Sequence, residues 1–480
     1  MLFNSIEFIV FFPLVVAAYF ALPGKFRWIL LLIASYYFYM CWNYKYIILI
    51  VFSTLVDYFA AIYMAKAEKK STKKILLAAS LTSNLGLLFF FKYYNFFSEN
   101  VDAVFAQFNI MKSMPVFDIL LPVGISFYTF QTLSYTIDVY WGKKEPEKHL
   151  GIFALYVSFF PQLVAGPIER STRLLPQFYK TYEFNYTRIK NGLILMAWGF
   201  FKKVVIADRL AEYVNEVYNN VGDYGGLHDL IATFFFGSQI YCDFSGYSDI
   251  AIGSAMVLGF DLMTNFKRPY LSRSIREFWA RWHISLSTWF RDYTYIPLGG
   301  NRVVKWRWYY NLFITFLVSG LWHGANWTFV IWGALHGAYL VLAIMTQKSR
   351  DQLAVKSGLY KIPHLNSFIN LVWTFVLVYF AWIFFRANNV NDAFAVIGNI
   401  LNPMTWSGNI QLFHFQSDLY LSFILIGILI LIEVLWEKYK LIETLQRQSR
   451  LVKWILMLVI LFSIFILGKW DQNDFLYFQF

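Results

Sequence analysis

Apolar stretches of roughly 18 residues or more recur along the whole chain, and each is long enough to cross the hydrocarbon core of a bilayer. A soluble domain of this length would show amphipathic stripes, and strands would alternate between apolar and polar residues. Mean hydropathy is +0.48, and only 15% of the residues are charged. The sequence therefore predicts an all-α polytopic membrane protein, with a single integral membrane domain over residues 1–480.

The apolar runs predict a bundle of roughly 11 to 13 membrane helices. The run at 229–262 is long enough for two shorter pieces, and 149–165 is brief. MLFNSIEFIVFFPLVV lacks the basic region and the cleavage site of a signal peptide, so we expect the first run to be a retained span. The expected spans lie near residues 5–22, 26–44, 46–65, 75–97, 116–140, 149–165, 189–207, 229–262, 308–324, 326–346, 366–385, 418–436 and 454–470.

Basic residues alternate between successive loops, which predicts the orientation because lysine and arginine collect on the cytoplasmic side. The loops at 66–74 and 142–148 are rich in lysine, whereas 98–115 holds Glu99, Asp102 and one lysine. We therefore expect the N-terminus outside, the basic stretch 438–453 inside and the C-terminal tail outside. The formal net charge of +12 largely reflects this asymmetry and does not argue for nucleic acid.

Cysteine and histidine patterns exclude several kinds of site. Cys41 and Cys242 both lie in apolar runs, so neither a disulfide framework nor a catalytic thiol is expected. The seven histidines form no HExxH or HxxxH motif, CxxC is missing, and we predict no metal site. G-x-S-x-G is also missing, which removes the usual serine nucleophile motif.

Ionisable side chains inside apolar runs are costly in a bilayer and therefore mark candidate sites. For His323 the alternatives are a hydrogen bond between helices or a general base, since imidazole titrates near neutral pH. Gly320, Gly324 and Ala325 remove bulk from the surrounding backbone, which would let a substrate or channel approach. His336 is as well explained by packing as by function. The other members of this set are Asp57, Asp138, Asp243 and Asp249.

The segment from Thr264 to Trp308 is neither a span nor an ordinary loop, because basic residues alternate there with aromatic ones. This mixture predicts short helices that lie in the interface or dip in from the cytoplasmic face. Its basic residues suit either lipid headgroups or a phosphate-rich cytosolic donor. They are Lys267, Arg268, Arg273, Arg276 and Arg281.

Several long motifs resemble the membrane-bound O-acyltransferases, specifically the branch of alginate and peptidoglycan O-acetyltransferases. The resemblance covers essentially the whole chain, with core motifs between residues 121 and 387. Its carriers are LPVGISFYTFQTLSYTIDVY (121–140), FFPQLVAGPIER (159–170), FGSQIYCDFSGYSDIAIG (236–253), REFWARWHISLSTWFRDYTYIPLGG (276–300), SGLWHGANW (319–327), WIFFRA (382–387) and the closing FLYFQF.

The resemblance implies a helical bundle around a central tunnel, with a donor entrance facing the cytoplasm and an acceptor entrance facing outward. His323 resembles the essential histidine of the family and is expected to act as the base. His283 resembles a second recurring polar position and is expected to act on the donor side or to orient a neighbour. Candidate substrate-binding residues are Gln239, Asp243, Trp322, Asn326, Arg273, Arg276 and Arg281. Packing explains Gln239 and Asp243 almost as well.

The implied reaction transfers an acyl group, most simply acetyl, to the hydroxyl of an extracytoplasmic polysaccharide or of a partner protein. A thioester donor such as acetyl-CoA is already activated, so the enzyme needs only to position the acceptor and remove its proton. No bound cofactor is expected. The resemblance further implies a multi-pass protein of a bacterial inner membrane, in contact with lipids and with an extracytoplasmic acetyltransferase or acceptor protein.

Three alternatives remain open from the sequence. Teichoic-acid D-alanylation enzymes are close relatives whose donor is a carrier-protein thioester. A polysaccharide or lipid transporter would use the buried aspartates as relay sites and would ordinarily show repeated halves, which are not visible. A nonenzymatic assembly subunit would not need a basic segment beside an intramembrane histidine.

Overall fold

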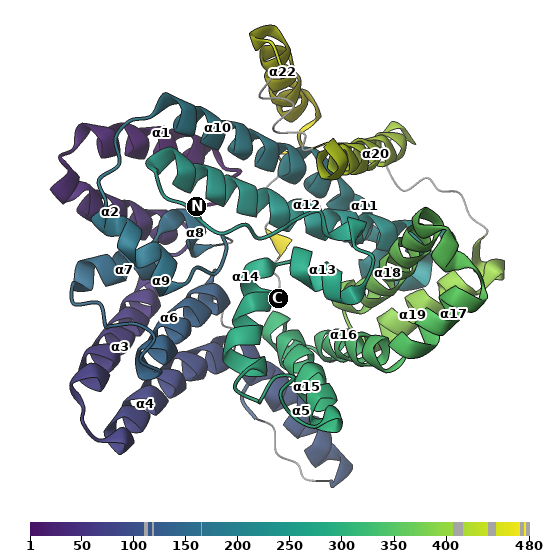
Figure 1. Cartoon of the computed structure of the whole chain (residues 1–480), viewed down its shortest axis with the longest axis horizontal. Coiled ribbons are helices and arrows are strands. Elements are labelled where there is room, and N and C mark those ends of the chain that lie inside the picture. The colour runs from purple at the N-terminus through teal and green to yellow at the C-terminus, as the bar shows by residue number, and fades with distance from the viewer. Residues whose placement is uncertain are drawn as a thin grey trace. The chain divides into compact units, whose positions relative to one another are not determined.

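A computed structural model describes residues 1–109, 114–117, 120–164, 166–406, 416–439, 448–470 and 475–476. Over these ranges the chain forms helices joined by short turns and contains no strand (Figure 1). The all-α prediction is therefore confirmed. The chain separates into two compact units, and α10 (Tyr186–Phe200) and α12 (Gly226–Leu258) each contribute residues to both. The prediction of one integral domain stays a prediction.

Unit 1 comprises residues 1–196, 247–263 and 477–480. Its helices α3, α4 and α6 pack against one another. The buried Asp57 of α3 accepts hydrogen bonds from the side chains of Ser80 and Asn84 of α4, so a carboxylate can be kept here by its neighbours. The α-helices that lie wholly in this unit are α1 (Ile6–Ala21), α2 (Arg27–Met40), α3 (Ile47–Lys66), α4 (Lys70–Leu88), α5 (Tyr94–Gln107), α6 (Ile125–Tyr140), α7 (Leu150–Ser158), α8 (Phe160–Leu163) and α9 (Ser171–Leu174).

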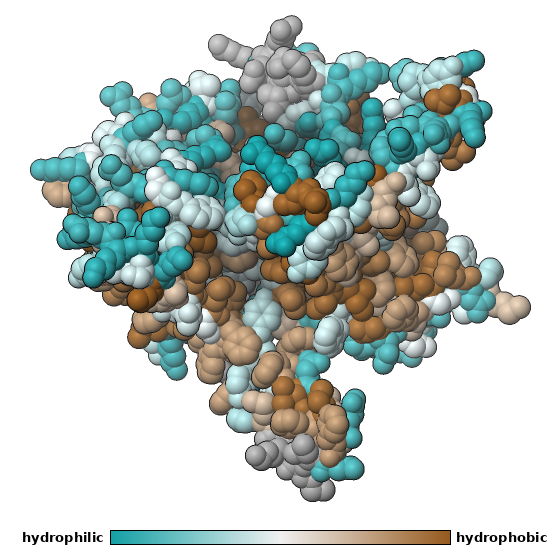
Figure 2. All heavy atoms as spheres, turned by 60° about the horizontal axis from the view of Figure 1, so that its bottom comes forward, coloured by the Kyte–Doolittle hydropathy of each residue, from teal (hydrophilic) through white to brown (hydrophobic). Residues whose placement is uncertain are grey.

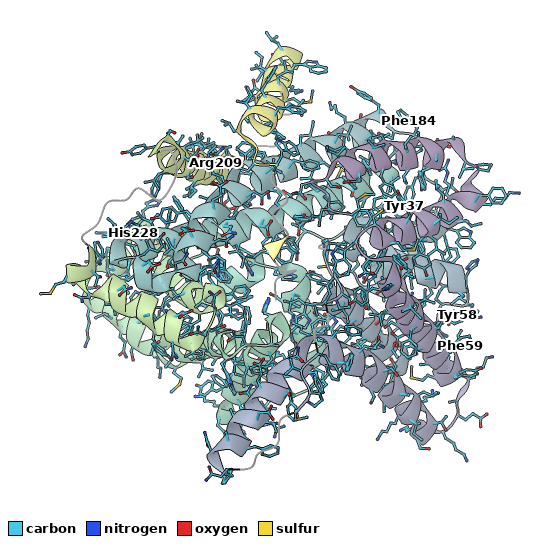
Figure 3. All side chains as sticks on the ribbon, turned by 180° about the vertical axis from the view of Figure 1, so that it is seen from behind. Tyr37, Tyr58, Phe59, Phe184, Arg209 and His228 are labelled. Atoms are coloured by element: carbon cyan, nitrogen blue, oxygen red, sulfur yellow. The ribbon has the colours of Figure 1, made fainter. Side chains whose placement is uncertain are left out.

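Unit 2 comprises residues 197–246 and 264–476. Arg209 of α11 joins two later helices, donating to Asp418 Oδ1 at 2.5 Å and to the carbonyl of Leu467 at 2.7 Å (Figure 3). The helices are α11 (Asp208–Asn219), α13 (Ile275–Arg281), α14 (Ile284–Phe290), α15 (Lys305–His323), α16 (Trp327–Met345), α17 (Gln347–Lys356), α18 (Pro363–Arg386), α19 (Val390–Leu401), α20 (Gln416–Tyr439) and α22 (Arg450–Leu467). π-Helical turns cover Phe201–Ala207 and Arg291–Tyr295.

Helices α15 and α16 form a closely packed hairpin that carries His323 at its turn. A Cβ atom added to Gly320 would lie 2.3 Å from the Phe329 carbonyl oxygen and 3.0 Å from the Cα of Gly333. A Cβ atom added to Gly333 would lie 2.5 Å from the Phe316 carbonyl oxygen. Small residues thus bring the two backbones together, as is common between helices in membranes.

Length and hydropathy identify five helical stretches able to cross a membrane in the described part of the chain. They coincide with the expected spans 46–65, 75–97, 326–346, 366–385 and 418–436, whereas 5–22 and 454–470 match shorter apolar helices. Figure 2 shows hydrophobic side chains, in brown, over wide areas of one face. Ile48 and Phe52 of α3 are 67% and 46% exposed, which suits contact with lipid.

Three predicted boundaries differ in the structure. Residues 229–262 lie mostly in the single helix α12 rather than in two shorter pieces. Helix continues from Lys70 to Gln107 through the π-helical turn Phe89–Tyr93, well past the expected end at 97. The run at 149–165 breaks between α7 and α8, where Phe159 leaves helical conformation and Pro161 lies in the first turn of α8.

Candidate active site

His323 is the last residue of α15, and its imidazole is buried in an aromatic cage with 2% exposure. Its ring centroid lies 5.0 Å from that of Trp322, 4.9 Å from Trp332 and 5.3 Å from Phe385. Each contact is edge to face, which holds the imidazole in one orientation. The surroundings exclude bulk water, so a proton transfer at this ring would occur in a medium of low dielectric.

His283 lies at the start of α14 and is fully buried. Its backbone is left-handed, with φ of 41°, a conformation that non-glycine residues rarely adopt. Its Nδ1 atom lies 3.1 Å from Asn265 Oδ1, which also accepts the backbone N–H of Ser285 at 3.2 Å. A backbone N–H can only donate, so the shared atom of Asn265 is the amide oxygen.

These bonds assign the tautomer of His283. Because Nδ1 faces an acceptor oxygen, Nδ1 carries the proton and Nε2 is the nitrogen able to accept one. Burial lowers the pKa of His283, so the neutral ring is the resting form. The site therefore contains an oriented, neutral imidazole.

Trp322 brings the two histidines together. The ring centroids of His283 and Trp322 are 6.4 Å apart, and Trp322 directly precedes His323 in the chain. Two histidines that lie 40 positions apart along the chain thus meet around one indole, and their catalytic roles stay predictions. Trp322 is itself buried, with 5% exposure.

The predicted basic segment does form short helices, α13 and α14, but its arginines are not equivalent. Arg281 lies 2.7 Å from Glu277 and 3.0 Å from Glu437, so its charge is paired within the protein. Arg268 also pairs with Glu437, at 2.6 Å. Arg273 and Arg276 are exposed, and no carboxylate in the described ranges forms an ion pair with them.

Asp243 of α12 belongs to a buried ion cluster. Lys203 lies 2.7 Å from Asp243 and 2.8 Å from Asp208, and all three side chains are less than 5% exposed. The backbone N–H of Leu476 also donates to Asp243, at 2.8 Å. These bonds account for Asp243 as a structural residue, and its role in substrate binding stays a prediction. Gln239, one turn earlier on α12, is buried.

Asn326 serves the helix hairpin. Its Oδ1 accepts the N–H of Thr328 at the start of α16, and its Nδ2 donates to the carbonyl of Asn388 at 2.8 Å. The expectation that Gly320 and Gly324 make room for substrate is wrong. The backbone of α16 fills the space beside Gly320, and the Phe329 ring lies 2.1 Å from a Cβ added to Gly324.

Two residues beside the histidines were missed from the sequence. Asn265, which orients His283, lies in a run with no periodic pattern, and Trp332 is one of many aromatic residues in an apolar helix. His336 lies beside Trp332, with its Nδ1 accepting from Trp279 Nε1 at 3.2 Å. One sequence signal could have identified Trp332. It precedes His336 by four residues, a spacing that puts two side chains on the same face of a helix.

The model of the membrane-bound O-acyltransferase family matches residues 149–385, which include both His283 and His323. The chain is also 37% identical to a protein of Azotobacter vinelandii named probable alginate O-acetylase AlgI, over 89% of this chain and 84% of that protein. The chain belongs to the membrane-bound O-acyltransferase family. It is therefore an acyltransferase of the membrane.

Other relatives of this O-acyltransferase differ in the substrates that their names give. A Helicobacter pylori protein named peptidoglycan O-acetyltransferase is 35% identical over 87% of the chain and 82% of that protein. A Streptococcus thermophilus protein named teichoic acid D-alanyltransferase is 30% identical, but over only 59% of the chain and 69% of that protein. The O-acetyltransferase relatives therefore match more of the chain.

Proposed function

We propose that this O-acyltransferase moves an acetyl group from a cytoplasmic thioester, acetyl-CoA in the simplest case, to a hydroxyl on the outer side of a bacterial inner membrane. The acceptor is a polysaccharide or a partner protein that passes the acetyl group on. The relatives named O-acetyltransferases support the acetyl group and the extracytoplasmic acceptor. The observation that carries the mechanism is the buried pair His283 and His323 around Trp322.

In this mechanism His323 takes the proton of the acceptor hydroxyl while that oxygen attacks the thioester carbonyl. The C–S bond then breaks, and the leaving thiolate takes the proton back from His323. His283, held by Asn265 with Nε2 as its accepting nitrogen, orients the donor or a neighbour of the base. No bound cofactor is required, because the thioester supplies the activated acyl group.

The experiment measures transfer by the purified protein in lipid nanodiscs, with radiolabelled acetyl-CoA and isolated envelope glycan. His323→Ala should lower the transfer rate by about two to four orders of magnitude, the usual worth of a positioned general base. His323→Gln should lose as much, because the amide keeps hydrogen-bonding capacity but cannot accept a proton near neutral pH. His364→Gln, at an exposed position on α18, is the matched control.

A folded His323→Gln protein with near-normal transfer would remove His323 from the mechanism. D-alanyl transfer is the alternative within the family, supported by the Streptococcus thermophilus relative. Mass analysis of envelope glycans with and without the gene decides between the two, because acetyl and D-alanyl esters differ in mass. Loss of D-alanyl esters alone on removing the gene would favour the alternative.

A further inference from the structure

Helix α16 carries a row of buried polar side chains on one face. Thr328, Trp332 and His336 are spaced four residues apart, and each is 0% exposed. Thr328 Oγ1, Trp332 Nε1 and His336 Nε2 have no hydrogen-bond partner among the residues that the structure describes. Unpaired buried polar groups are destabilising and rare in folded proteins, so three in a row on one helix point to a ligand as their partner.

The chemistry of that ligand follows from the hydrogen bond between Trp279 and His336. The indole N–H of Trp279 can only donate, so His336 Nδ1 must be unprotonated, and the neutral ring carries its proton on Nε2. Trp332 Nε1 is likewise a donor only. The two unpaired nitrogens are thus both N–H donors, and their ligand must offer acceptor oxygens.

The row runs from the base towards the basic segment. The ring of Trp332 is 4.9 Å from His323 on one side and 4.9 Å from His336 on the other. His336 accepts a hydrogen bond from Trp279 of α13. Helix α13 packs beside α16 and also carries the exposed Arg276 (Figure 1). A ligand lying along this face would therefore reach from His323 to the surface that bears Arg273 and Arg276.

We propose that Trp332 and His336 bind the acyl thioester donor through two of its carbonyl oxygens. Trp332 Nε1–H donates to the reacting carbonyl beside His323, and His336 Nε2–H donates to the first amide carbonyl of the pantetheine arm. Four residues of α-helix rise about 6 Å. The two carbonyl carbons of the donor are joined by five bonds, which extend over about 6 Å. This inference rests on the proposed function.

In the transfer step, the acceptor oxygen bonds to the carbonyl carbon while its proton passes to His323. The carbonyl π electrons move onto the oxygen that Trp332 holds, and the indole N–H stabilises the resulting charge. Collapse of this intermediate restores the carbonyl, breaks the C–S bond and returns the proton to the thiolate. Trp332 is a catalytic residue in this scheme, and His336 binds the donor arm.

The first test compares binding of two unreactive analogues of acetyl-CoA. One is the ketone in which a methylene replaces sulfur, and the other is the same chain with the ketone reduced to a methylene. The wild-type protein should prefer the ketone about tenfold, which corresponds to one hydrogen bond of about 1.4 kcal/mol. Trp332→Phe should abolish this preference. Trp382→Phe should keep it, because the Trp382 N–H already donates to the Tyr270 hydroxyl at 3.2 Å.

Kinetics supply the second readout. Trp332→Phe should lower kcat by about 10²- to 10³-fold, the usual effect of losing one oxyanion donor. His336→Gln, whose amide can reach the Nε2 position, should keep donor KM within a few-fold of wild type. His336→Asn, which can replace only the Nδ1 contact to Trp279, should raise it. If His336→Asn keeps the donor KM and His336→Gln raises it, His336 acts only through its hydrogen bond with Trp279, and the inference about its Nε2 is wrong.

An unchanged ketone preference in folded Trp332→Phe protein would overturn the inference and leave the proposed function intact. If wild-type protein binds neither analogue, acetyl-CoA is not the donor, and the inference fails together with that function. If Trp332→Phe does not fold, as judged by size-exclusion chromatography, the two His336 variants decide the inference alone.

Discussion

Asn265 determines which nitrogen of His283 can accept a proton. Substituting Asn265 therefore tests whether the orientation of His283 matters for activity. Asn265→Leu removes the acceptor of both His283 Nδ1–H and the Ser285 N–H. We expect a loss of about 10- to 100-fold in kcat/KM, the usual cost of losing a group that orients a functional histidine. Ser285→Ala, which leaves the Asn265–His283 bond in place, should cost less.

Asn265→Asp keeps the acceptor oxygen and adds a negative charge beside the ring. Burial holds the pKa of His283 below its usual value, and a neighbouring carboxylate would raise it again. Protonation of the ring removes its accepting nitrogen. As the pH is lowered, activity that depends on neutral His283 should therefore be lost at a higher pH in this variant than in the wild type. A pH–rate profile identical to that of the wild type would show that Asn265 has only a structural role.

Functional residues within a sequence motif could be predicted, whereas residues that act through contacts with distant parts of the chain could not. RWHISLS and SGLWHGANW pointed to His283 and His323, and the structure places both around Trp322. Asn265 could not be chosen, because its bond to His283 depends on a left-handed turn 18 residues later in the chain. The lysine partner of Asp243 was likewise hidden, since Lys203 lies on another helix.

At the scale of elements, the helix hairpin of α15 and α16 explains why the glycines beside His323 were misread. A glycine removes bulk whether a substrate or a helix takes the space, and the sequence does not distinguish these cases. Here the space beside Gly320 is filled by the backbone of α16, and the space beside Gly333 is filled by the backbone of α15. The spans themselves were predictable because lipid demands long apolar helices, whereas the break at Phe159 depends on local backbone angles.

The element α13 supports a prediction about the donor. Arg276 on α13 and Arg273 just before it are exposed, whereas Arg281 forms ion pairs with Glu277 and Glu437. Arg273→Gln with Arg276→Gln should raise the KM for acetyl-CoA roughly three- to tenfold at low salt, as expected for two exposed charges. The difference should shrink as ionic strength rises, because exposed charges are screened.

Arg281→Gln is the matched comparison for that double variant. It should leave the salt dependence of KM unchanged and lower the yield of folded protein slightly, because Glu277 loses its arginine partner and Glu437 keeps only Arg268. Donor KM values for all three proteins, measured between low and high salt, test both statements. An unchanged KM in the double variant at low salt would instead assign Arg273 and Arg276 to lipid headgroups.

At the scale of the whole molecule, the predicted orientation of the protein across the membrane can be tested at the two ends of one long helix. Ser71 and Asn100 lie on one continuous helical stretch, Lys70–Gln107. They are 29 residues apart (100 − 71), and the intervening helix rises about 43 Å at 1.5 Å per residue. A bilayer with its headgroups is about 40–45 Å thick, so the two positions should face opposite compartments.

The loop charges predict that Ser71 faces the cytoplasm and Asn100 the outside. Ser71→Cys and Asn100→Cys are introduced separately into a Cys41→Ser background, because Cys41 is exposed and would itself react. An impermeant thiol reagent applied to intact cells should label Asn100→Cys, and Ser71→Cys should react only after permeabilisation. The reverse pattern would invert the orientation and place the donor entrance outside, where acetyl-CoA is not supplied. Labelling of both in intact cells would mean that this helix does not cross the membrane.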